Sequence, residues 1–161
     1  MLEEQRLDSK RHHCTDFDCG TPVLNEYLAR YASRHRKRGV TQIYVLVDTE
    51  APSVVLGYYT LSATEVDTSQ LTEAERKKLP RFPIPCFRMG RLAVSKDQQG
   101  KHLGEKLIGL AVDRCLHARE DVAAYALLVD AKDGRAKAFY EHFGFIACPD
   151  QPMALYLPLG Q

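Results

Sequence analysis

The chain has almost no net charge, because 22 basic and 21 acidic side chains leave a formal charge of +1 over 161 residues. No global electrostatic field therefore points to nucleic acid as a partner, and such a prediction must rest on local patches. The chain also lacks an apolar run long enough to predict a membrane-spanning helix. Its first residues, MLEEQRLDSKRHH, lack the apolar core of a signal peptide, so we expect a cytoplasmic protein.

The cysteines and histidines lack the spacings that hold a metal ion or build a disulfide framework. There are five cysteines, an odd number, and no two of them form a CxxC pair. The six histidines include no HExxH motif. We therefore expect no metal site and a reducing compartment.

Apolar periodicity predicts strands that alternate with helices in the second half of the chain and a strand hairpin in the first half. No repeat or change of composition marks a linker, so we predict one α/β domain over residues 1–161 with a mixed sheet. The predicted strands span residues 41–48, 53–66, 86–94, 122–131 and 151–159. The predicted helices span residues 22–38, a short polar segment after residue 71, a segment ending near residue 117, and residues 134–145.

The segment QQGKHLGEKL, residues 98–107, places glycines and positive charge where a strand ends and a helix begins. Free N–H groups and the helix dipole make such a junction an anion site. The spacing matches neither GxxxxGK[ST] nor GxGxxG. The alternative is a plain connection with glycines at tight turns.

The segment RLAVSKDQQGKHLGEKL resembles the coenzyme A motif of the GNAT superfamily, the acetyl-CoA-dependent N-acetyltransferases. Gln99, Gly100 and Gly104 match its Gln/Arg-x-x-Gly-x-Gly/Ala pattern, whereas His102 stands where a glycine is usual. The resemblance implies a GNAT fold, a mixed and mostly antiparallel central sheet flanked by helices, whose splayed strands hold coenzyme A. It assigns binding of acetyl-CoA, without a metal, to Leu92, Ala93, Val94, Gln99, Gly100, Lys101, His102, Leu103 and Gly104.

Tyr140 lies in the segment AKAFYEHFGF, and periodicity alone favours a packing role in the core. The family resemblance implies instead that Tyr140 is the general acid that protonates the leaving thiolate of coenzyme A. Tyr156, on a strand with alternating apolar neighbours, is assigned to packing. No carboxylate lies on the strand FRMGRLAV, so a general base is either Glu65 or Asp67 acting through water, or is not needed.

Five further segments resemble a GNAT subgroup, the toxins of bacterial toxin–antitoxin pairs: FDCGTPVLNEYL, GYYTLS, KKLPRFPIP, GRLAV and AKAFY. The resemblance covers about residues 17–145. It implies acetylation of the α-amine of aminoacyl-tRNA, which blocks translation, and a separately encoded ribbon–helix–helix antitoxin as partner. The ester-linked α-amine has a low intrinsic pKa, which is why a base is not required. A homodimer stays open.

Two basic clusters are candidates for contact with the RNA phosphates. The alternative for each cluster is a solvated helix end. The acceptor also has alternatives, namely a small-molecule or protein amine, and a third alternative is a non-catalytic coenzyme-A-binding or interaction domain. The RNA candidates are Arg34, Arg36, Lys37 and Arg38 in the first cluster, and Lys77, Lys78, Arg81 and Arg91, with Arg88 beside them, in the second.

Overall fold

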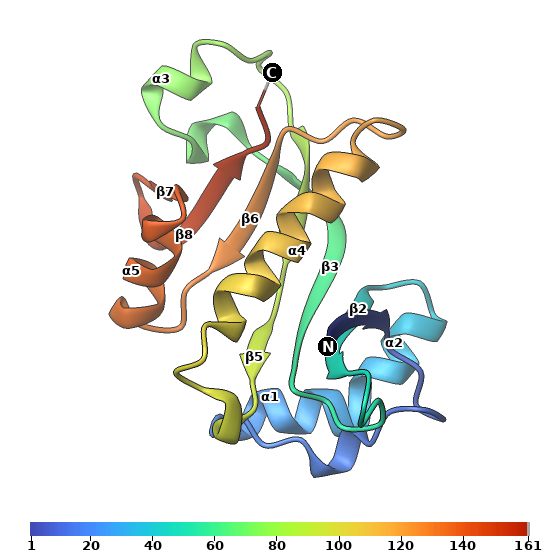
Figure 1. The fold of residues 1–161 in the computed structure, drawn as a ribbon. Coiled ribbons are helices and arrows are strands. Elements are labelled where there is room, and N and C mark those ends of the chain that lie inside the picture. Colours follow the sequence, from blue (N-terminus) through green and yellow to red (C-terminus); the bar gives the residue numbers. More distant parts are fainter. Residues whose placement is uncertain (161) are drawn as a thin grey trace. The chain divides into compact units, whose positions relative to one another are not determined.

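The computed structural model describes residues 1–160 of the chain, which is drawn as a ribbon in Figure 1. The predicted domain also includes Gln161, which lies outside the described residues. The described part of the chain folds as two compact units. The first unit contains residues 1–62 and 90–111, and the second contains residues 63–89 and those from 112 onward.

The first unit contains an antiparallel arrangement of strands in the order β1-β2-β3, with β5 also paired to β3. The predicted hairpin is confirmed, because β2 and β3 pair antiparallel and are joined by residues 49–56. Tyr44 and Tyr59 face each other in this pair, and their rings stack at 5.2 Å. The bounds are β1 Leu2–Arg6, β2 Gln42–Asp48, β3 Gly57–Val66, whose last four residues belong to the second unit, and β5 Leu92–Val94.

A helical segment precedes β2 and starts where Pro22 occupies the first turn, a position that tolerates the missing N–H. It ends before Gly39, whose φ of +71° favours glycine. The predicted helix is present, but it is divided by a π-helical turn that periodicity did not indicate. The bounds are α1 Pro22–Glu26, the π turn η2 Tyr27–Tyr31, and α2 Ala32–Lys37.

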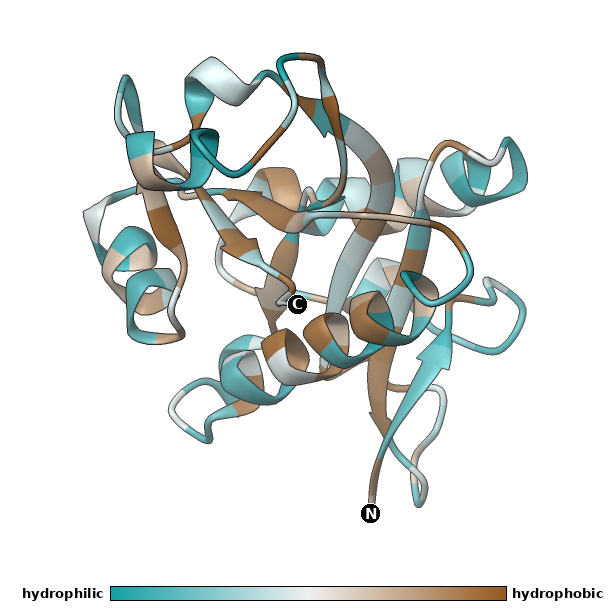
Figure 2. Cartoon of the chain, turned by 90° about the horizontal axis from the view of Figure 1, so that it is seen from above, coloured by the Kyte–Doolittle hydropathy of each residue, from teal (hydrophilic) through white to brown (hydrophobic). Residues whose placement is uncertain are grey.

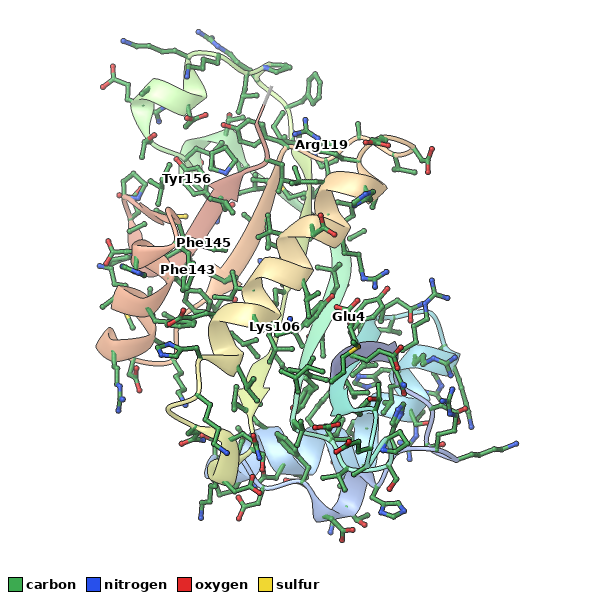
Figure 3. All side chains as sticks on the ribbon, in the orientation of Figure 1. Glu4, Lys106, Arg119, Phe143, Phe145 and Tyr156 are labelled. Atoms are coloured by element: carbon green, nitrogen blue, oxygen red, sulfur yellow. The ribbon has the colours of Figure 1, made fainter. Side chains whose placement is uncertain are left out.

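The GYYT motif explains how β3 is fixed in the first unit. A side chain on Gly57 would lie 2.9 Å from the carbonyl oxygen of Ala93, so only glycine permits the close approach of β3 to β5. Tyr58 is fully buried, and its hydroxyl donates to the carbonyl of Leu24 at 2.6 Å. The Tyr59 hydroxyl donates to Glu4 Oε2 at 2.6 Å, and Figure 3 labels Glu4. The two tyrosines therefore tie β3 to a helix and to β1.

The second unit contains the strand order β4-β6-β8-β7. Strand β4 runs parallel to β6, whereas β8 is antiparallel to both β6 and β7. In Figure 2, most strands carry brown hydrophobic bands and the helices alternate brown with teal, as expected of elements with one buried face. The bounds are α3 Glu73–Arg76, β4 Ile84–Met89, β6 Ala126–Asp130, α5 Gly134–His142, β7 Ile146–Cys148 and β8 Gln151–Pro158.

Helix α4 (Leu103–Ala118) has residues in both units. At its end, Arg119 donates to the carbonyl of Gly160 at 3.0 Å, and Figure 3 labels Arg119 at this position. Gly160, the last described residue, is thus held by a side-chain hydrogen bond. Short 3-10 turns complete the described elements: Cys14–Asp16, Thr68–Gln70 and Lys96–Gln98.

Tyr156 belongs to the core of the second unit, as the alternating pattern of β8 predicted. It is fully buried, and its hydroxyl accepts from the backbone N–H of Thr72 at 3.2 Å and donates to Thr72 Oγ1 at 3.1 Å. Figure 3 labels Tyr156 on β8. These two bonds satisfy the buried hydroxyl, so Tyr156 has a structural role.

The α/β prediction with a mixed, mostly antiparallel sheet is confirmed, since β4–β6 is parallel and five other pairings are antiparallel. The predicted single strand over residues 86–94 was wrong. Pairing with β6 ends at Met89, and pairing with β3 begins at Leu92. Strands β1 and β7 were not predicted, because β1 reads LEEQR with little apolar alternation and β7 has only three residues.

None of the helices described over residues 1–160 is long and apolar enough to cross a membrane. Within the same residues, no group of three or more His, Cys, Asp or Glu side chains is arranged to hold a metal ion. The five cysteines are free thiols.

His12 is a buried polar side chain in the first unit, with 2% of its surface exposed. The backbone N–H of Asp8 donates to its Nδ1 at 3.0 Å, so Nε2 carries the proton and donates to Gln5 Oε1 at 2.8 Å. Burial lowers the pKa of His12, and the nearby charge of Arg11 lowers it further. The folded protein therefore holds a neutral imidazole.

We predict that His12 makes folding stability fall in mild acid. The unfolded chain binds a proton below about pH 6.5, whereas folded His12 does so only at lower pH, so the free energy of unfolding decreases by up to about 1.4 kcal/mol per pH unit. His12→Asn keeps an acceptor for the Asp8 N–H and should flatten the dependence below about pH 7. Urea unfolding at several pH values measures this effect. Equal slopes in His12→Asn and the parent would contradict the assignment.

Candidate active site

The glycine segment lies in the first unit, as a loop between β5 and α4. After Val94 ends β5, the 3-10 turn Lys96–Gln98 leads to Gly100, whose φ is +85°. His102 then has a φ of +63°, and α4 begins at the next residue. Two left-handed residues thus turn the backbone sharply into the helix.

The first turn of α4 presents backbone N–H groups to the loop. Lys106 N–H donates to the carbonyl of His102 at 3.2 Å, which is the bond that starts the helix. The N–H groups of Leu103, Gly104 and Glu105 precede this bond and have no acceptor within the helix. With the positive end of the dipole of a 16-residue helix, they form a suitable site for a phosphate group.

His102 occupies the position at which a glycine is usual in the GNAT motif, and its φ of +63° explains that preference. A non-glycine residue in this region costs about 1–2 kcal/mol, so the loop retains local strain. The side chain is exposed, and its Nδ1 lies 3.0 Å from Glu105 Oε1. The imidazole therefore points to Glu105 on α4, and the backbone of His102 adopts the left-handed conformation that a glycine would have at this position.

Gln99 fixes the loop by a side-chain bridge. Its Nε2 donates to the carbonyl of Cys19 at 2.9 Å and to the carbonyl of Val94 at 3.0 Å. A second connection joins the same segments, because Lys96 N–H donates to the carbonyl of Asp18 at 2.9 Å. The motif glutamine thus holds the loop between the end of β5 and the FDCG segment.

The FDCG segment is itself held by Asn25 of α1. Asn25 Oδ1 accepts from the N–H of Cys19 at 2.8 Å, and Asn25 Nδ2 donates to Asp18 Oδ1 at 2.9 Å. The N–H of Gly20 donates to the same carboxylate oxygen, and this bond is the main reason that the pKa of Asp18 is lowered. These residues belong to a sequence motif, but their role in bracing the loop was not predicted. The only sequence feature that could have indicated this role is that FDCG and Asn25 occur together in the segment FDCGTPVLNEYL.

Strand β5 places the remaining candidate cofactor residues beside β3. Leu92, Ala93 and Val94 pair with Tyr59, Tyr58 and Gly57 respectively. Ala93 is buried in the core of the first unit, and Leu92 and Val94 are half-buried. Every residue of β5 is therefore fixed by pairing with β3, as far as the start of the loop. Lys101 is exposed in the loop, Leu103 is buried and Gly104 is half-buried.

Tyr140 lies in the second unit on α5, which Asp133 caps by accepting from the N–H of Ala136 at 2.8 Å. The side chain is 8% exposed, and its ring packs against those of Phe139 and Phe145, with centroids 5.7 and 5.5 Å apart respectively. Figure 3 labels Phe145 just after this helix.

The environment of Tyr140 keeps its phenol protonated. Burial raises the pKa to about 12, and the charge of Asp130 contributes to this rise. Near pH 7 the phenol therefore carries a proton and is available as a donor to the sulfur of a leaving thiolate, and the raised pKa makes it a weaker acid than a free tyrosine. The geometry is compatible both with packing and with general-acid chemistry.

Asp67 is poorly suited to be the general base. Its Oδ1 accepts from the N–H of Ser69 at 2.9 Å, and Gln70 completes a capping box at the 3-10 turn. The backbone hydrogen bond of Ser69 lowers the pKa of Asp67, which weakens its carboxylate as a base. Glu65 is exposed near the end of β3.

The first basic cluster lies at the end of α2 in the first unit. Arg34, Lys37 and Arg38 are exposed, and Arg36 is half-buried. Arg91 also belongs to the first unit, where its guanidinium carbon lies 3.5 Å from the ring centroid of Tyr27.

The second basic cluster is largely paired with carboxylates in the second unit. Lys77 lies 3.3 Å from Glu73, Lys78 lies 4.0 Å from Glu75, and Arg88 donates to Asp130 at 2.6 Å. Arg81 is exposed. The sequence predicted that this cluster can neutralise RNA phosphates, whereas the charge of Lys77 and Lys78 is already partly neutralised by Glu73 and Glu75.

Comparisons with known proteins give the family of the chain. The sequence model of the acetyltransferase (GNAT) domain matches residues 39–147, and the chain belongs to this family of acetyltransferases. A relative from Mycobacterium tuberculosis (strain H37Rv), named tRNA-acetylating toxin, is 34% identical over 143 residues, which cover 89% of this chain and 84% of the relative.

Two solved structures share the fold. AtaT complexed with acetyl-methionyl-tRNAfMet has a TM-score of 0.91 and 29% identity, and the match covers 98% of this chain and 95% of AtaT. A tyrosine-to-phenylalanine mutant of the toxin AtaT, bound to the C-terminus of the antitoxin AtaR and to acetyl-CoA, has a TM-score of 0.84 and 27% identity. That match covers 98% of this chain and 93% of the other.

We predict that Gly104→Glu abolishes most of the affinity for acetyl-CoA, because it adds a carboxylate to the helix turn that faces the phosphates. Isothermal titration measures the affinity. Gly109→Glu is the matched control, since it adds the same charge to the same helix at an exposed position with no atom within 4 Å of the new Cβ. A folded Gly104→Glu protein that binds acetyl-CoA as tightly as Gly109→Glu would show that the loop is a plain connection.

Proposed function

We propose that this protein transfers the acetyl group of acetyl-CoA to the α-amine of aminoacyl-tRNA, and that it blocks translation as the toxin of a toxin–antitoxin pair. The observation that carries this proposal is the hydrogen-bonded loop before α4, which Gln99 joins to the FDCG segment and Asn25. The loop supports binding of coenzyme A. The FDCG segment and Asn25, which hold the loop, belong to the segments that resemble the toxin subgroup.

The relatives support the choice of acceptor. One is named a tRNA-acetylating toxin, and AtaT has been solved with acetyl-methionyl-tRNAfMet. AtaT has also been solved with an antitoxin and acetyl-CoA. We infer that this chain has the same kind of acceptor, cosubstrate and partner, namely tRNA, acetyl-CoA and an antitoxin. The reason is that the matches to these relatives cover nearly the whole sequence.

In the proposed mechanism, the amides of the loop from Gly100 to Gly104 hold the pyrophosphate of coenzyme A. The thioester supplies the activated acetyl group. The neutral amine attacks the thioester carbonyl, a C–N bond forms and the C–S bond breaks. Tyr140 gives its proton to the sulfur, and the amine releases its own proton to solvent. Solvent then returns a proton to the Tyr140 phenolate, so the enzyme is unchanged after the reaction.

A dedicated base is not required if the amine is already neutral, which suits an α-amine esterified to RNA. Asp67 is held as a cap, so Glu65 acting through water is the remaining candidate among the two predicted carboxylates. Proton release directly to solvent is the simpler pathway.

The proposal includes the setting in which the protein acts. We propose a single GNAT domain over residues 1–161, a cytoplasmic location, a ribbon–helix–helix antitoxin and, as a further option, a homodimer. The structure with AtaR supports an antitoxin in general. Its DNA-binding class and the dimer rest on the resemblance to the toxin subgroup.

The alternatives are an enzyme for small-molecule or protein amines and a non-catalytic coenzyme-A-binding domain. Acetylation assays with aminoacyl-tRNA, free amines and peptides distinguish the first alternative. Binding of acetyl-CoA with no turnover on any acceptor would favour the second.

We predict that Tyr140→Phe lowers the rate of acetyl transfer by roughly 10²–10⁴-fold, because the ring stays and the proton donor is lost. Single-turnover transfer to charged tRNA measures the rate. Thermal stability and acetyl-CoA affinity should stay close to the parental values. Relief of growth arrest on expression is the expected cellular result.

Tyr156→Phe is the matched control, because it removes a buried hydroxyl that is bonded to Thr72. It should cost about 1 kcal/mol of stability and leave the rate nearly unchanged. A Tyr140→Phe protein with the parental rate would identify Tyr140 as a packing residue and overturn this mechanism.

We predict that charge reversal of Arg34 and Arg38 raises the KM for charged tRNA and flattens its salt dependence, while acetyl-CoA affinity is unchanged. Loss of two phosphate contacts reduces the slope of log K against log salt by about 2. Reversal of Lys77 and Lys78 should have a smaller effect, because Glu73 and Glu75 already neutralise part of their charge. The reversal of Lys77 and Lys78 changes the net charge by the same amount and is therefore also the control for net charge. An unchanged KM after reversal of both clusters would remove the electrostatic support for RNA.

A further inference from the structure

Tyr31 is a large aromatic side chain that remains exposed at the junction of the π turn and α2. It keeps 40% of its surface exposed, whereas Tyr27, four residues earlier, keeps 4%. Neither the mechanism nor the charge argument uses Tyr31. An exposed tyrosine next to a run of basic residues is a candidate contact for a ligand that is both flat and anionic.

Tyr31 belongs to a cluster of packed planar side chains formed with Tyr27, His35 and Arg91. Its ring stacks on that of Tyr27, with centroids 6.4 Å apart and an interplanar angle of 29°. The Arg91 guanidinium carbon lies 3.5 Å from the centroid of the Tyr27 ring. His35 lies 6.2 Å from Tyr31 and forms a 2.9 Å hydrogen bond with the Tyr27 hydroxyl through Nδ1. Contacts with Tyr27 and His35 restrict the Tyr31 ring, so binding a flat partner costs little additional ordering.

The π turn brings these rings together. The N–H of Ala32 donates to the carbonyl of Tyr27, a bond to the fifth preceding residue instead of the fourth. Such wide turns are rare and occur frequently at functional sites. Here the wide turn keeps Tyr27 and Tyr31 in stacking contact while Tyr27 is buried and Tyr31 is exposed.

The charge around Tyr31 suits a nucleic acid. Arg34 is exposed on α2 and Arg38 is exposed at the C-cap of that helix, both close in sequence to the ring. Arg91 immediately precedes β5, and its carbonyl accepts from the N–H of Thr60 at 3.1 Å. The stack is therefore anchored to the strand that leads into the coenzyme A loop.

We propose that Tyr31 is the stacking surface for an unpaired base at the 3′ end of the RNA acceptor, while Arg34 and Arg38 bind its phosphates. The inference rests on the proposed function and adds a residue that recognises a base. Single-stranded RNA ends are recognised by stacking on aromatic side chains, and cations beside the ring strengthen this contact. Tyr31 acts on binding of the acceptor and takes no part in the transfer of the acetyl group.

Fluorescence anisotropy with two labelled RNA hairpins tests the proposal, one with an unpaired 3′ end and one without it. Stacking of a base contributes about 1–3 kcal/mol, so Tyr31→Ala should raise the Kd for the hairpin with the unpaired end by roughly 5–150-fold. It should leave the Kd of the blunt hairpin unchanged. The slope of log K against log salt should also stay the same, because no charge is removed. Tyr31→Phe keeps the ring and should bind like the parent.

Val122→Ala is the matched control, because it truncates another exposed apolar side chain, in the turn after α4 and outside the helical segment that carries the ring stack. Acetyl-CoA affinity should be unchanged in every variant, which also shows that each protein is folded. Equal loss on both hairpins, equal loss in Tyr31→Phe and Tyr31→Ala, or no loss in Tyr31→Ala would each overturn the proposal. A parental protein that binds neither hairpin would overturn the RNA acceptor itself, and the stacking role with it.

Discussion

The two hydrogen bonds from the Gln99 side-chain amide, to the carbonyls of Cys19 and Val94, are the constraint on which the rest of the site depends. They join the end of β5 to a segment some 80 residues earlier, and the bond from Lys96 N–H to the Asp18 carbonyl reinforces them. A loop with a left-handed glycine and a left-handed histidine would otherwise have many conformations. The bridge keeps the N–H groups at the start of α4 pre-oriented, so a phosphate does not have to order them.

The same bridge explains why a GNAT loop and an early FDCG segment occur in one chain. Asn25 and Asp18 shape the turn whose carbonyls Gln99 and Lys96 bind. That turn leads into α1 and the π turn, which carry the tyrosine stack and are followed by the basic residues of α2. Within the first unit, the coenzyme A loop and the proposed RNA surface are therefore built on one hydrogen-bonded framework.

Much of the fold was predictable because β2, β3, α4, α5 and β8 have strong apolar periodicity. Strand β1 was not, since its residues are mostly polar and its pairing with β2 is a long-range choice. The π turn was also not predictable, because one extra residue in a helical turn leaves the apolar spacing of Leu24, Tyr27, Leu28 and Tyr31 nearly unchanged.

In the candidate site, the conformation of the loop glycines was predictable from the sequence, whereas the ion pairs of the basic residues were not. The loop glycines follow from local backbone geometry, and Gly100 indeed has a positive φ. The ion pairs of Lys77, Lys78 and Arg88 were hidden, because a run of basic letters does not show which carboxylates lie beside it.

The most direct test of the central claim is mass spectrometry of the aminoacyl group after the purified protein is incubated with acetyl-CoA and charged tRNA. The account predicts an acetyl group on the α-nitrogen of the amino acid released from the tRNA, and no acetylation of uncharged tRNA or of the free amino acid at comparable concentration. An unmodified aminoacyl group, from a folded protein that binds acetyl-CoA, would contradict it.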